Sequence, residues 1–172
     1  MNLNLLGVYA DVYGFGVNRF QYSDGIYQID IIEQSPICSL DRFTDTVSKL
    51  VPIKTAYTNN SKLSNHGLYK LGLQIISTDI PDEYDKESPF NLRDCHEIIT
   101  SLLNDNRLMF KESVVKNIRS ELSGYVIGDN SHSVLALFFG IGIHAINEQI
   151  SFRRKGFYLS GNQYTASSVA LW

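Results

Sequence analysis

Apolar and β-branched residues dominate the first 32 positions and predict strands rather than helices. Three such runs stand close together, at Leu5–Phe15, Val17–Tyr22 and Ile26–Ile32. The last two are separated by Ser23-Asp24-Gly25. Asp-Gly between apolar runs favours a tight hairpin, because glycine tolerates the positive φ that such turns need. The chain is therefore expected to begin with antiparallel strands.

The middle of the chain has the 3.6-residue periodicity of amphipathic helices. A first helix is predicted behind Ser39, a good N-cap residue, and stops before Pro52. A second is predicted from Asn91 to Leu103, with Asp94 three residues after the capping asparagine. A third is predicted over 111–123, where Gly124 is suited to close it in a left-handed conformation.

Further strands are predicted towards the end of the chain. In Val134–Ile146, large apolar residues alternate with Ala136, Gly140 and Gly142. As a strand, this segment would present a small-residue face that another backbone could approach closely. The other expected strands are Leu68–Thr78, Tyr125–Ile127, Phe157–Leu159 and Tyr164–Trp172.

This order of elements predicts an α+β fold. Its sheet would be largely antiparallel and built from N- and C-terminal strands, with about three helices from the middle of the chain packed on one face. At 172 residues, a single domain over 1–172 is expected.

Composition and charge limit which cellular compartment and which classes of partner are expected. Hydrophobic residues make up 44% of the chain, which suits a packed core. The net charge of -3 argues against nucleic acid, whose binding usually needs a basic face. Two cysteines and the lack of a signal sequence suggest a cytoplasmic protein, or a virion protein assembled in the host cytoplasm. The most apolar stretch has 13 residues, too short for a membrane span.

One pair of residues has catalytic potential. Cys38 precedes a predicted helix N-terminus, where the helix dipole would lower its pKa, and His66 could act as its base. That chemistry requires the two side chains to be within hydrogen-bond reach, and no family signature surrounds Cys38. We therefore assign no catalytic residue and keep these two as candidates only.

Metal and cofactor motifs are absent from the sequence. Cys95 and His96 are adjacent on a predicted helix, so they point about 100° apart, and neither has a ligand one turn later. In Gly14-Phe15-Gly16, Arg19 stands where a dinucleotide fingerprint has its third glycine. The two glycines are interpreted as turn or bulge positions, and neither a metal nor a cofactor is predicted.

Two oppositely charged segments are candidate interaction sites. The acidic segment contains Asp79, Asp82, Glu83, Asp85 and Glu87, and the basic segment contains Arg153, Arg154 and Lys155. Opposite patches on one subunit could pair head to tail between copies, which builds rings or stacks. The expected partners are therefore copies of the chain or other subunits of an assembly, without nucleic acid or a membrane span.

These observations favour a non-enzymatic structural or assembly subunit of a larger complex, such as a phage tail, neck or baseplate component. One alternative is a cytosolic immunity protein that binds and neutralises a bacterial toxin, in a discrete one-to-one complex. A second is a Cys-dependent hydrolase using Cys38 and His66. The sequence gives neither the partner, nor the symmetry, nor the surface used.

Overall fold

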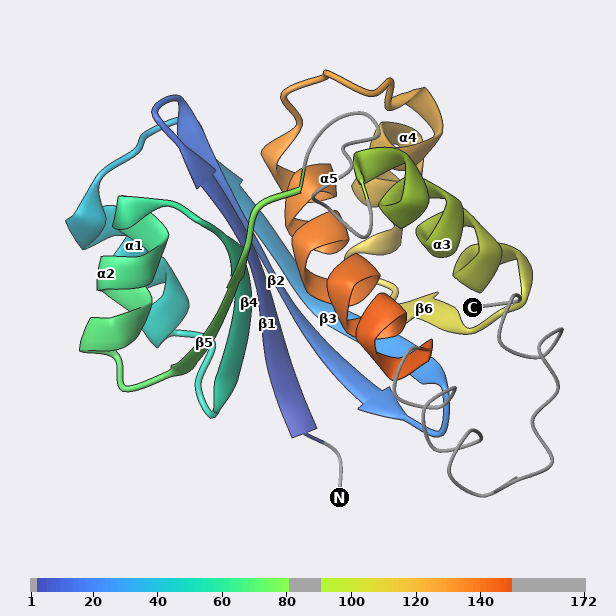
Figure 1. The fold of residues 1–172 in the computed structure, drawn as a ribbon, viewed down its shortest axis with the longest axis horizontal. Coiled ribbons are helices and arrows are strands. Elements are labelled where there is room, and N and C mark those ends of the chain that lie inside the picture. The colour runs from blue at the N-terminus through green and yellow to red at the C-terminus, as the bar shows by residue number, and fades with distance from the viewer. Residues whose placement is uncertain (1–2, 81–90, 150–172) are drawn as a thin grey trace, which may run out of the picture.

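The computed structural model describes residues 3–80 and 91–149, which are arranged around a six-stranded sheet (Figure 1). The strands lie in the order β5-β4-β1-β2-β3-β6. The strands β1, β2 and β3 pair antiparallel, β4 and β5 extend the sheet parallel to β1, and β6 pairs parallel with β3. Their bounds are β1 Leu3–Asp11, β2 Gly14–Ser23, β3 Ile26–Ser35, β4 Thr55–Asn59, β5 Gln74–Thr78 and β6 Leu108–Phe110.

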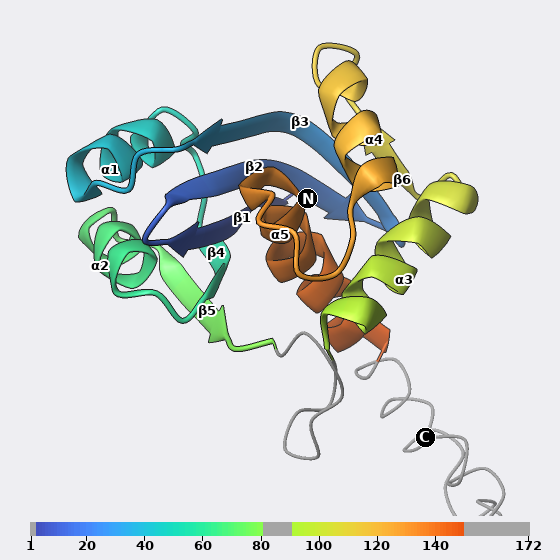
Figure 2. The ribbon, with the colours of Figure 1, turned by 90° about the horizontal axis from the view of Figure 1, so that it is seen from above.

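Helices cover both faces of this sheet (Figures 1 and 2). The helices α1 and α2 pack on one face, while α3, α4 and α5 lie on the other. The helix that starts as α5 continues through a π-helical segment, η1, and stays helical to residue 149. The bounds are α1 Leu40–Ser48, α2 Lys62–Lys70, α3 Leu92–Asn104, α4 Val115–Gly124, α5 His132–Leu137 and η1 Phe138–Gly142.

Local signals in the sequence are confirmed where they specify caps and turns. Ser39 caps α1 by accepting a hydrogen bond from the backbone N–H of Arg42. Asn91 and Asp94 form a reciprocal capping box at the start of α3. Gly25 adopts a positive φ in the hairpin between β2 and β3. Each of these features depends on a few neighbouring residues, which is why sequence alone predicts it.

The predicted fold class is wrong, and the largest error is Val134–Ile146. This segment is the helix of α5 and η1, not a strand, and all of its residues are buried. A helix that is apolar all round has no amphipathic period to distinguish it from a strand. Its small residues do permit close approach, since a Cβ on Gly140 would lie 2.7 Å from the Cα of Gly7 in β1.

The sheet also differs from the prediction in its parallel strands. The segment Leu68–Thr78 divides into the end of α2 and the strand β5, and β4 forms just before it. Residues 125–127 are not a strand. Gly124 is the last residue of α4, and it does not adopt the positive φ that was expected of it. The strands predicted at Phe157–Leu159 and Tyr164–Trp172 lie outside the described residues. The described chain therefore has a mixed sheet with helices on both faces.

Candidate functional site

The candidate site lies where the carboxyl ends of β1 and β4 meet the start of α5. These two strands are parallel neighbours, and the chain leaves β1 towards β2 on one side but returns to β4 on the other. In sheets with parallel strands, ligands bind outside the carboxyl ends at such a switch point. Asp11 ends β1, Asn59 ends β4 and His132 begins α5, so polar side chains from three distant segments gather at this edge.

Hydrogen bonds hold the three elements together. The side chain of Asn59 accepts from the backbone N–H of Ala10 at 3.0 Å and donates to its carbonyl oxygen at 2.7 Å, which joins the ends of β4 and β1. The Nε2 atom of His132 lies 2.8 Å from Oδ1 of Asp11, which joins α5 to β1. The side-chain amide of Asn59 is thus hydrogen-bonded to the backbone of β1. In His132 the contact with Asp11 uses Nε2 and does not involve Nδ1.

Asp11 also fixes the turn that follows it. Its Oδ1 accepts the backbone N–H groups of Tyr13 and Gly14, at 2.8 and 3.1 Å. Neither Val12 nor Tyr13 has a positive φ, so this two-residue turn lacks the conformation most favoured in hairpins. An aspartate bonded to the backbone two residues later stabilises such a turn in another way. A single carboxylate therefore orients both the hairpin tip and His132.

The imidazole of His132 is enclosed but reachable. Its side chain is 13% exposed, and that of Asp11 is 22% exposed. The ring of Tyr9 lies 5.8 Å from the imidazole, and Phe139 packs behind Tyr9 at 5.4 Å. With the Nε2 proton donated to Asp11, Nδ1 is left as a hydrogen-bond acceptor. This arrangement orients a histidine for proton transfer.

Glycine permits the close contact between α5 and the sheet. A Cβ on Gly16 would overlap the backbone oxygen of His132, and one on Gly14 would overlap that of Ser35. Gly16 lies within β2, so the prediction of a turn or bulge is wrong for Gly16, whereas Gly14 is the first residue of β2 and closes the turn after β1. The register shift of this strand lies instead between Arg19 and Phe20.

A second carboxylate flanks the start of α5. Glu121, on α4, accepts hydrogen bonds from the hydroxyl groups of Ser131 and Ser133. It borders a small cavity of about 160 Å³, which is lined by Ile32, Gln34, Ser113, Val114, Ile118, Glu121 and Ser133. Glu121 and Asp11 thus bond to neighbouring residues at the same helix end, but each is already paired with a different group.

The structure brings Cys38 to this edge, in a role different from the one considered for it. Its Sγ–H donates to the backbone oxygen of Asp11 at 2.6 Å. The pKa of the Cys38 thiol is raised, first by burial and then by the nearby charge of Asp11. The expected lowering of its pKa is therefore wrong, and Cys38 ties the loop after β3 to the end of β1.

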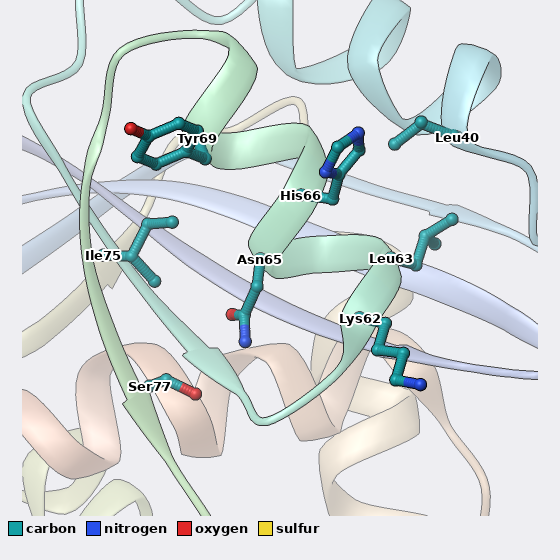
Figure 3. Close-up of a pocket in the computed structure, with 8 residues that line it drawn as sticks. All are labelled: Leu40, Lys62, Leu63, Asn65, His66, Tyr69, Ile75 and Ser77. Carbon is teal, nitrogen blue, oxygen red and sulfur yellow. The ribbon is translucent and has the colours of Figure 1, made fainter.

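His66 lies elsewhere, on α2. It lines an open hollow of about 930 Å³, whose other lining residues are Leu40, Lys62, Leu63, Asn65, Tyr69, Ile75 and Ser77 (Figure 3). Within the described chain, no hydrogen bond links His66 to Cys38. The hollow is lined by residues of α1, α2 and β5 and includes no acidic side chain.

Most of the charged candidate residues lie outside the part of the chain that the structure describes. Asp79 lies within it, and its carboxylate accepts a hydrogen bond from the side chain of Asn60 at 3.5 Å. The other acidic candidates, Asp82, Glu83, Asp85 and Glu87, lie outside the described residues, as do Arg153, Arg154 and Lys155. Head-to-tail pairing of the two segments stays a prediction.

The site residues Asp11, Asn59 and His132 were missed by the sequence analysis. A signal exists for Asp11, which is the first polar side chain after the apolar run Leu5–Ala10. Asn59 has no such signal, because Thr55 and Thr58 precede it. His132 carries no such signal. It lies two residues before Val134–Ile146, which was predicted as a strand, so nothing placed it near β1.

Comparison with known proteins identifies the fold. No protein-family model matches the chain, and no curated protein matches it. Among solved structures, the large terminase of a thermophilic bacteriophage is similar, with a TM-score of 0.62 and 12% identity over 80% of this chain. The large terminase nuclease of the thermophilic phage G20c has a TM-score of 0.58 and 11% identity, over 80% of each chain. The Holliday junction resolvase of fowlpox virus has a TM-score of 0.50 and 11% identity, over 86% of this chain and 99% of its own.

The fold is thus the one shared by terminase nuclease domains and Holliday junction resolvases. The chain spans 38% of the length of the first of these terminase chains. This finding overturns the expectation of a non-enzymatic tail, neck or baseplate subunit, and with it the alternatives of an immunity protein and a Cys-dependent hydrolase. Within residues 3–80 and 91–149, no helix has both the length and the apolar character needed to cross a membrane.

Nucleases commonly use divalent metal ions, so the fold raises the question of a metal centre. Such ions are held by several oxygen or nitrogen ligands that are free to coordinate. Among the described residues, no group of three or more histidine, cysteine, aspartate or glutamate side chains could hold one. The Oδ1 atom of Asp11 is shared between His132 and the hairpin turn, so this carboxylate offers at most Oδ2, whereas a metal centre needs several ligands. The described side chains at this edge therefore do not fit a two-metal centre.

Proposed function

We propose that this chain binds DNA at the edge formed by β1, β4 and α5 and hydrolyses a phosphodiester bond there. The observation that carries the proposal is the hydrogen bond between Asp11 and His132, located at the carboxyl ends of parallel strands. The likeness to terminase nucleases and a junction resolvase supports DNA as the substrate class. It also supports a setting in viral DNA processing, with further protein subunits as partners.

His132 would act as the general base. With its Nε2–H donated to Asp11, Nδ1 takes a proton from a water molecule as that water attacks the phosphorus atom. The water oxygen forms the new P–O bond, the bond to the leaving sugar oxygen breaks, and the imidazolium returns the proton to that oxygen. Asp11 orients the ring and stabilises its positive charge. No step in this scheme passes through a metal ion.

Charge sets the expected mode of binding. A chain with a net charge of -3 gains little from general attraction to phosphate, so local contacts and the shape of the DNA must supply most of the affinity. The sequence analysis excluded nucleic acid as a partner because of that net charge alone. Affinity should accordingly depend less steeply on salt than it does for strongly basic DNA-binding proteins.

The test measures cleavage and binding separately, on linear duplexes and four-way junctions, with magnesium, with manganese and with EDTA. The variant His132→Gln should reduce the cleavage rate by about 100-fold or more, the usual contribution of a general base, and leave DNA affinity within about threefold. His66→Gln, on α2, is the matched control and should cleave at the wild-type rate. Undiminished cleavage by His132→Gln, or wild-type protein that neither binds nor cleaves any substrate, would overturn the proposal.

A further inference from the structure

Large apolar side chains are exposed beside the candidate site. Val12 and Tyr13 form the tip of the hairpin between β1 and β2 and are 82% and 68% exposed. Ile37, in the loop after β3, is also exposed. In Figure 1 the hairpin tip stands clear of the helices. Tyr13 is two residues from Asp11, so any group contacting the tip is next to the Asp11–His132 pair.

The tip is held in place at its base by several contacts. Asp11 accepts the backbone N–H groups of Tyr13 and Gly14. Gly14 lies against the backbone of Ser35, and Cys38 donates to the backbone oxygen of Asp11, which fastens the loop after β3 to the hairpin. The backbone of the tip is therefore held before any ligand binds, which lowers the conformational entropy that binding costs.

The chemistry of the tip indicates which part of DNA it contacts. Neither Val12, Tyr13 nor the loop Ser35–Ser39 carries a charged side chain. Phosphate groups are contacted by cations and hydrogen-bond donors, whereas the faces of unpaired bases stack on aromatic rings. An uncharged apolar tip therefore suits bases that are already unstacked, and this affinity does not require a basic protein surface.

We propose that Tyr13 is a stacking subsite for an unpaired DNA base, and that Val12 and Tyr13 together wedge into an open duplex end or a branch point. This inference rests on the proposed function and deepens it, because it assigns a preference for branched or frayed DNA over intact duplex. Stacking delivers the adjoining phosphodiester to His132, whose partner Asp11 stands at the base of the same hairpin.

The test compares the affinity for a four-way junction with that for a blunt duplex, using the purified full chain. Tyr13→Ser should weaken junction binding about 10-fold, the usual effect of losing one base–aromatic stack, and leave duplex binding unchanged. Tyr13→Phe should bind as the wild type does, because it keeps the ring. Tyr69→Ser removes an exposed tyrosine from α2 and is the matched control, expected to show no change.

Fluorescence of 2-aminopurine at the branch point gives a second readout. Wild-type protein and Tyr13→Phe should quench it by stacking, and Tyr13→Ser should not. Equal losses on junction and duplex, or no loss on either, overturn the subsite. A drop in dimer content for Tyr13→Ser without any change in DNA affinity would also overturn it and assign the tip to a second copy of the chain. If the wild-type protein cleaves DNA without preferring branched substrates, this inference alone is refuted. If the wild-type protein binds no DNA at all, the proposed function is refuted too.

Discussion

The carboxylate of Asp11 and the imidazole of His132 are separated by 121 residues in the sequence and by 2.8 Å in the structure. This contact joins the last residue of β1 to the first residue of α5, across the edge where parallel strands end. Because Asp11 also fixes the hairpin tip, one side chain couples the candidate base to the surface that we assign to DNA.

The strength of this pair can be measured without any assumption about function. A double-mutant cycle with Asp11→Asn and His132→Gln, followed by urea unfolding, should give a coupling of about 1 kcal/mol, as expected for one partly buried hydrogen bond. Asn keeps the Oδ1 atom that accepts from the hairpin N–H groups and from the histidine, so the cycle measures the part of the contact that depends on the charge of Asp11. Additive effects of the two substitutions would show that this charge-dependent part contributes nothing to stability.

Close packing at Gly16 makes a second prediction. An alanine there would place its Cβ against the backbone oxygen of His132, so Gly16→Ala should lower the free energy of unfolding by about 1–3 kcal/mol. Gly124→Ala is the control, since nothing lies within 4 Å of the added carbon at the end of α4. It should be neutral or stabilise by about 0.5–1 kcal/mol, because alanine favours helix more than glycine does. Equal effects from both would contradict the packing seen at α5.

The fold was predictable where short-range interactions determine it. The hairpin at Gly25, the N-cap at Ser39 and the capping box at Asn91 each depend on residues within one turn. The segment Val134–Ile146 was not predictable in this way, because complete burial removes the polar positions that mark a helical period. Taking it as a strand favoured an antiparallel sheet. The parallel strand β4 was missed separately, because no strand was predicted over Thr55–Asn59.

The candidate site was less accessible to sequence analysis than the fold. Asp11, Asn59 and His132 belong to three segments that are far apart in the sequence, and only the tertiary structure brings them together. Cys38 attracted attention as a reactive residue type, yet its thiol bonds a backbone oxygen and its pKa is raised. Residue type thus drew attention to Cys38, whereas position at the carboxyl end of β1 selects Asp11, and the hydrogen bond with Asp11 selects His132.

Two asparagines provide a third prediction. Asn18, on β2, is fully buried, and neither of its side-chain polar atoms has a hydrogen-bond partner among the described residues. Removing such a group relieves a desolvation cost, so Asn18→Leu should raise stability by about 1–2 kcal/mol. Asn59→Leu should lower it, because Asn59 makes two hydrogen bonds with Ala10. Thermal and urea unfolding of the two variants check the opposite signs, and destabilisation by Asn18→Leu would mean that its amide is satisfied.

A buried histidine far from the candidate site makes the last prediction, which concerns pH. The Nδ1 atom of His144 lies 2.8 Å from the hydroxyl group of Tyr27, and the rings of Phe20, Tyr22 and Tyr57 surround the imidazole. Burial lowers the pKa of His144, and Glu148 opposes this shift to a smaller extent.

The folded state therefore prefers neutral His144, while the unfolded chain binds a proton near the ordinary pKa of about 6.5. Below that pH the unfolded state holds more protons, so the contribution of His144 to stability is present above about pH 6.5 and is lost as the pH falls towards its lowered folded pKa. Urea unfolding of wild-type protein and His144→Gln measures this loss between about pH 8 and about pH 5, a range that includes the ordinary histidine pKa. Carboxylates contribute equally to both proteins, so the wild type should lose stability more steeply on acidification, and parallel curves would contradict the neutral buried histidine.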